Sequence, residues 1–113
     1  MDGGLISSLV MSDSESVLVT VFLKHDQSQT IDEIKERLQN TGFWGAFPPE
    51  GMEVVSWYVM MGIGQVATVR VPVDRVREFN MSIEQTAWGA FETEFYLTYD
   101  FVPVWEKFRA AAT

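Results

Sequence analysis

Hydrophobic and polar positions follow two different periods along this chain, and the change of period marks its elements. Residues 17–23 are almost continuously apolar and largely β-branched, which is typical of a strand buried on both faces. Apolar residues then recur at helical spacing over 30–40, where Thr30 and Glu33 have the spacing of a capping box. Gly42 stands where a helix-ending glycine belongs. The first third of the chain therefore predicts a strand followed by a helix.

The remaining pattern continues in the same way. Strands are predicted at 54–61, 66–71 and 92–100, and helices from about 74 to 87 and again from 103. Asp74 is a suitable N-cap for the first of these helices. Pro103 can open the last helix, and we expect its Val104, Trp105 and Phe108 to pack back onto the domain. The glycine-rich stretch 62–64 lies between two apolar runs and predicts a hairpin turn.

A tetrapeptide occurs twice, as Trp44-Gly45-Ala46-Phe47 and as Trp88-Gly89-Ala90-Phe91. Each copy lies between a predicted helix and a predicted strand, which indicates a duplicated β-α-β unit. The order β-α-β-β-α-β, followed by a short helix, is that of the ferredoxin-like α+β arrangement, with both helices on one face of a four-stranded antiparallel sheet. We assign residues 16–113 to this single domain. Residues 1–15, which include the polar and acidic run Ser12-Asp13-Ser14-Glu15, are predicted to form a flexible tail.

Composition excludes several classes of function. The 113 residues and the 47% hydrophobic content fit one globular domain. The net charge of −8, with no basic stripe, argues against nucleic acid and against an anionic membrane surface as partners. The chain has no cysteine, which removes disulfides, thiolate chemistry and cysteine-based metal sites and fits a cytoplasmic protein. A single histidine cannot build a usual transition-metal site, so neither metal nor cofactor is expected.

Strand parity assigns a second set of side chains to the face of the sheet that the helices leave uncovered. The apolar set Ala67, Val69, Val71, Phe95, Leu97 and Phe101 is expected to meet the helices. The opposite set is Leu18, Thr20, Phe22, Lys24, Val54, Ser56, Tyr58, Met60, Val66, Thr68, Arg70, Glu92, Glu94, Tyr96, Thr98 and Asp100. This face is too apolar for a solvated surface and too charged for a plain core. A partly buried cavity with paired charges suits both properties.

This pattern resembles the dimeric α+β barrel proteins, in which two ferredoxin-like subunits set their sheets face to face. The resemblance covers nearly the whole chain beyond the tail, in pattern only. No catalytic motif distinguishes the branches, whether antibiotic-biosynthesis-type monooxygenase, muconolactone-isomerase-like or polyketide cyclase. What the resemblance implies is a homodimer, paired through its sheet faces, with a pocket for a small organic ligand.

Candidate chemistry centres on His25, the single histidine and the natural general base near neutral pH. In the expected topology the first and third strands run parallel and the fourth runs antiparallel to the first, so Lys24, His25, Arg70 and Glu94 meet at one end of the sheet, where they could position and deprotonate an acidic substrate. The alternative is a histidine at a strand end beside a surface ion pair. Tyr58 and Tyr96 share the uncovered face and could bind a carbonyl or enolate; alternatively, both are amphipathic packing residues.

Two functions therefore stay open. In the first, His25 is the catalytic base of a cofactor-independent monooxygenase, isomerase or cyclase, Tyr58 and Tyr96 orient a hydrophobic or aromatic substrate, and Arg70 counters its charge. The predicted substrate-binding residues are Thr20, Phe22, Lys24, Ser56, Met60, Thr68 and Glu94. In the second, the same pocket belongs to a non-catalytic ligand-binding or protein-interaction dimer. A purely structural dimer would instead have a solid interface without a void.

Overall fold

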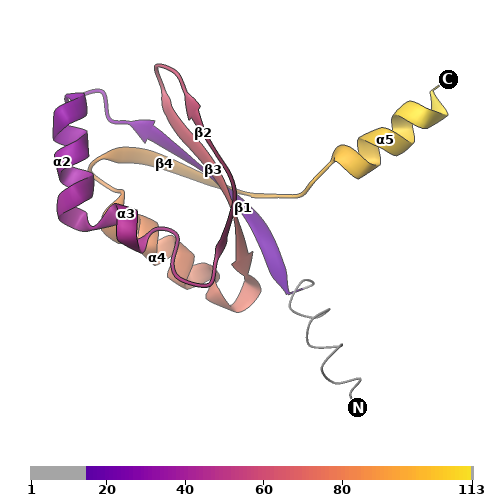
Figure 1. Cartoon of the computed structure of the whole chain (residues 1–113), viewed down its shortest axis with the longest axis horizontal. Coiled ribbons are helices and arrows are strands. Elements are labelled where there is room, and N and C mark those ends of the chain that lie inside the picture. The colour runs from indigo at the N-terminus through magenta and orange to yellow at the C-terminus, as the bar shows by residue number, and fades with distance from the viewer. Residues whose placement is uncertain (1–14, 113) are drawn as a thin grey trace, which may run out of the picture.

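The computed structural model describes residues 15–112, and within them the chain is α+β with a four-stranded antiparallel sheet and four α-helices (Figure 1). The elements are β1 (Ser16–His25), α2 (Ile31–Thr41), α3 (Phe43–Ala46), β2 (Glu53–Met60), β3 (Gly64–Pro72), a 3-10 turn (Val73–Arg75), α4 (Val76–Thr86), β4 (Phe91–Thr98) and α5 (Val102–Ala111). The prediction of a flexible tail concerns residues that lie almost entirely outside this described range.

The strands lie in the order β2-β3-β1-β4, and each neighbouring pair is antiparallel. Ser16 is opposite Pro72 and Lys24 is opposite Gly64, so β1 and β3 run in opposite directions. The expectation that the first and third strands are parallel is therefore wrong. The reason is topological: the helix crossover makes β1 parallel to β2, and the β2–β3 hairpin then reverses the chain.

The first helix has both ends that the sequence predicts. The Thr30 hydroxyl accepts from the Glu33 amide at 3.1 Å, and the Glu33 carboxylate accepts from the Thr30 amide at 2.7 Å, which confirms the capping box. Gly42 adopts the left-handed conformation with φ 75° and donates to the Gln39 carbonyl at 3.2 Å. These contacts satisfy backbone groups that the helix itself leaves unpaired.

The two copies of the repeated tetrapeptide differ in conformation but agree in burial. Trp44 belongs to the short helix α3, whereas Trp88 precedes a turn in which Gly89 has φ 92°. Phe47 and Phe91 are both buried, at 4% and 3% exposed. In each copy the phenylalanine anchors the corner in the core while the tryptophan stays more than half exposed.

The core lies between the sheet and the layer formed by α2, α3 and α4. Its largest fully buried side chains are Phe43, Phe79, Leu23, Ile83, Val21, Val69 and Val71. Phe43 is central, because its ring lies 5.2 Å from that of Phe47 and 5.9 Å from that of Phe91, measured between centroids. The alternation of buried and less buried residues along β1 and β3 shows that the helices cover one face of the sheet.

The start of α4 differs from the sequence-based expectation. The 3-10 turn Val73–Arg75 precedes α4, and the residue before α4 is Arg75, which makes no side-chain capping bond. Asp74 is therefore not an N-cap. β3 continues to Pro72, and the tight turn that follows takes up the next three residues, so that Asp74 lies inside a turn.

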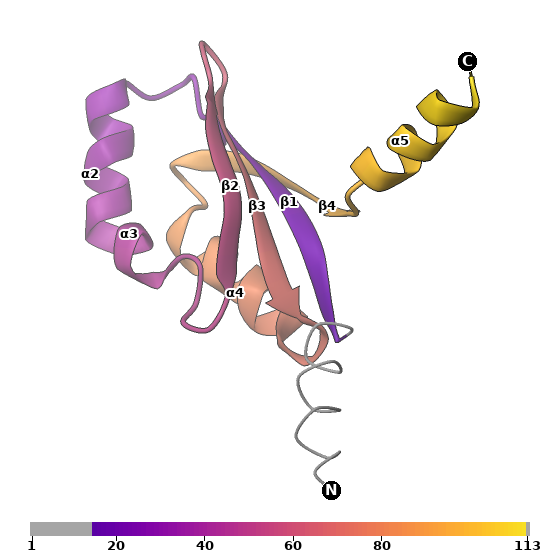
Figure 2. The same cartoon turned by 45° about the vertical axis from the view of Figure 1, so that its right-hand side comes forward.

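The last helix does not pack back onto the domain, contrary to expectation. In Figures 1 and 2 the sheet lies between α5 and the helices α2 and α3, and α5 extends away beyond the end of β4. No residue of α5 is buried, and Trp105 and Phe108 are 48% and 64% exposed. None of the helices within residues 15–112 has the length and apolar character needed to cross a membrane.

Candidate ligand-binding face

The face of the sheet that points away from α2, α3 and α4, here called the open face, carries four rows of side chains. Because neighbouring strands pair residue by residue, each row contains one residue from every strand in the order β2, β3, β1, β4. From one end to the other the rows are Glu53–Arg70–Leu18–Thr98, Ser56–Thr68–Thr20–Tyr96, Tyr58–Val66–Phe22–Glu94 and Met60–Gly64–Lys24–Glu92. With Glu53 in place of Val54, these are the residues that strand parity assigns to this face within the strands.

A β-bulge in β2 causes the exchange of Glu53 for Val54. The register shifts between Val54 and Ser56, so Val55 has no partner on β3. Beyond a bulge the parity of the strand is inverted, which places Glu53 opposite Arg70 on the open face and Val54 opposite Val69 on the covered one. Glu53 and Arg70 form an ion pair of 3.2 Å between Oε1 and Nε.

The second row consists entirely of hydroxyl groups and is here called the hydroxyl row: Ser56, Thr68, Thr20 and Tyr96. Thr20 lies at its centre, with its hydroxyl 2.9 Å from that of Thr68 and 3.0 Å from that of Thr98 in the next row. These three threonines are half-buried. A hydroxyl can donate once and accept twice, so the row offers a ligand both donors and acceptors without any charge.

Apolar and aromatic side chains flank the hydroxyl row. Phe22 and Val66 are half-buried at the centre of the third row, and Tyr58 at its end is 68% exposed. The Phe22 ring meets the Tyr96 ring edge to face, with 5.9 Å between centroids and 77° between planes. Aromatic surface beside neutral polar groups is typical of sites that bind small organic molecules.

Lys24, Glu94 and Tyr96 form a hydrogen-bonded network at one side of this face. Lys24 Nζ donates to Glu94 Oε2 at 2.7 Å, and the Tyr96 hydroxyl donates to Glu94 Oε1 at 3.0 Å. The hydrogen bond from Lys24 is the main cause that lowers the pKa of Glu94. Hydrogen bonding to the Glu94 carboxylate raises the pKa of both Lys24 and Tyr96. Tyr96 therefore acts as a neutral hydrogen-bond donor, and Glu94 is a weaker base than an ordinary glutamate.

Replacing Lys24 with methionine is expected to lower stability in a pH-dependent way. The pKa of Glu94 falls below 4.5 on folding, so the contribution of the pair is fully present above pH 4.5 and is lost as the pH falls through the lowered value. The pKa of Lys24 rises above 10.5, so the contribution is fully present below pH 10.5 and is lost as the pH rises further. Urea denaturation across this range measures the difference between wild type and variant.

The control is Lys35→Met on α2, which removes a charge outside the open face. If the Lys24 variant differs from wild type by the same amount at pH 3 as at neutral pH, the ion pair does not stabilise the fold in the way described.

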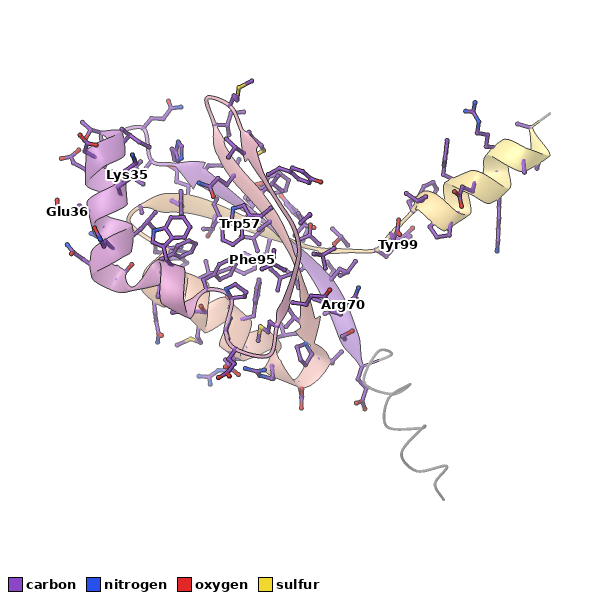
Figure 3. All side chains as sticks on the ribbon, viewed as in Figure 1. Lys35, Glu36, Trp57, Arg70, Phe95 and Tyr99 are labelled. Carbon is purple, nitrogen blue, oxygen red and sulfur yellow. The ribbon has the colours of Figure 1, made fainter. Side chains whose placement is uncertain are left out.

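The structure does not bring together the predicted catalytic residues. His25 is on the covered side of β1, where its ring stacks on that of buried Phe91 at 5.9 Å between centroids, whereas Tyr58 and Tyr96 are on the open face. Arg70 lies opposite Leu18, six residues along β1 from Lys24, which is about 20 Å in a strand; Figure 3 shows it toward the start of β1. The predicted cluster thus reduces to Lys24 and Glu94.

A hollow lies on the covered side of the sheet, and sequence reasoning missed it. It has a volume of about 360 Å³ and is lined by Val19, Val76, Phe79, Asn80, Phe95, Tyr96 and Leu97, from β1, α4 and β4. Leu97 follows the covered-face parity of Phe95 but is 74% exposed, because no helix covers this end of β4. The alternation along β4 predicts the face of Leu97, but it carries no signal that the face is uncovered there.

No group of three or more His, Cys, Asp or Glu side chains within residues 15–112 is arranged to hold a metal ion. The open face offers hydrogen bonding by neutral hydroxyls, aromatic contact and two ion pairs, Lys24–Glu94 and Arg70–Glu53. No protein-family model matches the sequence, and comparisons with curated proteins and with solved structures give no match either.

Proposed function

We propose that this chain is a small-molecule-binding homodimer of the dimeric α+β barrel type. Two ferredoxin-like subunits would set their open faces against each other and enclose a ligand between them. The observation that carries the proposal is the hydroxyl row centred on Thr20, which crosses all four strands and is flanked by aromatic residues. A neutral organic molecule with hydrogen-bonding groups and some aromatic or aliphatic surface fits this arrangement.

Covering of the open face by a second copy is supported by its composition. Tyr58 and Tyr96 are 68% and 52% exposed, and together with Phe22 and Val66 they form a contiguous apolar surface of the kind that marks interaction sites. Burying the charged groups of this face in a dimer would cost less free energy than burying isolated charges, because Lys24 pairs with Glu94 and Arg70 pairs with Glu53. Two sheets that pack face to face lie about 10 Å apart when their side chains interdigitate fully, so an enclosed ligand requires a wider spacing, which the short side chains of Ser56, Thr68 and Thr20 would leave around the hydroxyl row.

Binding without turnover is the function that the geometry supports best. Proton abstraction needs a base whose pKa lies near the working pH. Hydrogen bonding lowers the pKa of Glu94 and raises that of Tyr96, and both shifts move these groups away from such a role. His25 stacks on Phe91 on the other side of the sheet. The open face is thus better suited to recognise a ligand than to deprotonate one.

Removing the Thr20 hydroxyl is expected to weaken ligand binding at least about tenfold, because valine keeps the shape but removes the hydroxyl that links those of Thr68 and Thr98. The measurement is native mass spectrometry of freshly purified Thr20→Val, compared with the fraction of wild-type protein that carries a co-purified organic molecule. Thr93→Val is the matched control: it lies on the same sheet, but its hydroxyl accepts from Trp88 Nε1 at 3.1 Å instead of facing the open side. Equal retention of the ligand by the Thr20 and Thr93 variants would refute the role of the hydroxyl row.

A further inference from the structure

We propose that α5 docks on a second copy of this chain, with its apolar stripe in the hollow between β4 and α4 of that copy. The two copies would exchange their C-terminal helices reciprocally. The hollow lies on the covered side of the sheet, although Tyr96 of the hydroxyl row also contributes to its lining, and the inference can fail while the ligand-binding proposal holds. The helix, the hollow and the connection between β4 and α5 each contribute to the argument.

One face of α5 is apolar and exposed. Phe101, Val104, Trp105 and Phe108 follow the i, i+3, i+4, i+7 spacing that places side chains on one face of a helix. Within residues 15–112 the aromatic contacts of this segment are internal to it: Phe101 with Tyr99 and Phe108, and Arg109 over the Trp105 ring. An isolated helix of ten residues is only marginally stable in water, so packing elsewhere must stabilise it.

The hollow has the apolar lining and the size that such a stripe requires. Its lining residues Val76, Phe79, Phe95 and Leu97 are apolar, and Leu97 and Val76 are 74% and 41% exposed. The volume of about 360 Å³ is sufficient for the aromatic side chains of a docked helix. The hollow opens beside the last residues of β4, the edge strand from which α5 departs. In a two-fold dimer that brings these edges together, each helix starts close to the hollow of its partner.

The connection to α5 directs the helix away from its own domain. The Asp100 carboxylate accepts from the Val102 amide at 2.9 Å, which fixes the start of α5 directly after a three-residue connection from Thr98, the end of β4. Figure 3 shows Tyr99 on this connection, apart from Phe95 on the sheet. To enter the hollow of its own domain, the chain would have to break the Asp100 cap and reverse direction within those residues.

Area and charge both favour a second copy as the partner. Phe101, Trp105 and Phe108 expose about half of their side chains, which corresponds to roughly 300 Å² at 150–250 Å² per aromatic residue. With the exposed parts of Leu97 and Val76, which are 74% and 41% exposed, added to this area, two reciprocal contacts would bury close to the roughly 1,000 Å² that a stable interface needs. α5 carries Lys107 and Arg109 against Glu106, whereas the whole chain has a net charge of −8. The helix is thus slightly basic in an acidic chain, which favours its contact with an acidic second copy.

Disulfide trapping tests the exchange cleanly, because the chain contains no cysteine. Full-length Leu97→Cys and Phe108→Cys proteins are purified separately, mixed under mild oxidation and analysed on non-reducing gels. The mixture is expected to form a covalent dimer at least about tenfold faster than a mixture of Leu97→Cys with Lys107→Cys, because docking raises the effective concentration of the paired thiols. Lys107 lies on the same helix but outside the apolar stripe.

The double variant Leu97→Cys/Phe108→Cys distinguishes the remaining outcomes. A covalent dimer supports exchange, whereas a monomer with an internal disulfide shows that α5 occupies the hollow of its own chain and overturns the inference. Equal rates for the Phe108 and Lys107 cysteines, with circular dichroism confirming folded proteins, overturn it as well. Loss of the ligand in the Thr20→Val variant is unaffected by any of these results, so the two proposals fail separately.

Discussion

Replacing Phe43 with alanine is expected to lower the free energy of unfolding by about 3–5 kcal/mol, the cost of removing a buried phenylalanine and leaving a cavity. Phe43 is fully buried. Its ring contacts those of Phe47, Phe91 and Trp57, at 5.2, 5.9 and 6.3 Å between centroids, so it joins α3 to both the β2 and the β4 sides of the core. A loss of this size is a large fraction of the stability of a small domain. Urea unfolding followed by circular dichroism measures it.

The neighbouring residue provides the control. Trp44 belongs to the same helix but is 59% exposed, although its ring stacks on that of Trp57 at 6.4 Å between centroids. Trp44→Ala is expected to cost less than about 1 kcal/mol, as is usual for surface substitutions. If the two variants unfold at the same urea concentration, the core is not organised around Phe43 as described.

Replacing Tyr58 with glutamate is expected to weaken homodimerisation at least about 100-fold, because the new charge would be buried without a partner between two sheets. Tyr58 is on the open face, opposite Val66. Its neighbour Val59 points to the covered side of the same strand and is exposed to nearly the same extent, 70% against 68%. Val59→Glu is therefore a matched control that changes the charge equally but on the other face.

Sedimentation equilibrium of both variants gives the two dissociation constants. Only an interface on the open face would give the two variants different dissociation constants, because in an isolated monomer both glutamates would be equally solvated. Equal weakening by both substitutions would place the interface at the edge of β2 instead, and no weakening by Tyr58→Glu would remove the open face from the dimer.

Local sequence patterns predict most elements of this fold because those elements depend on interactions between residues that are close in the sequence. The capping box at Thr30 and the glycine after α2 determine the ends of that helix through backbone hydrogen bonds. Strand parity likewise assigns Thr20, Phe22 and Tyr96 correctly to one face, because side chains alternate along a strand. The hydroxyl row could thus be predicted as a set of residues sharing a face, although its alignment depends on the register.

The errors arise where the outcome depends on distant parts of the chain. The expectation that Arg70 lies beside Lys24 fails because β3 runs antiparallel to β1, and hydrophobic periodicity contains no information on strand direction. The β-bulge at Val55 exchanges Val54 for Glu53 on the open face, and no residue type there signals the extra position. The stripe on α5 predicts that Trp105 and Phe108 need cover, but a hydrophobic pattern does not specify which surface supplies it.

The measurement that tests the central claim most directly is native mass spectrometry of freshly purified wild-type protein, under conditions that keep small ligands bound. We expect a homodimer that carries a neutral organic molecule, and we expect Tyr58→Glu to release the molecule and weaken the pairing of the subunits while Val59→Glu retains both. A wild-type protein that is monomeric at every accessible concentration would contradict the pairing of open faces, and with it the enclosed site around the hydroxyl row.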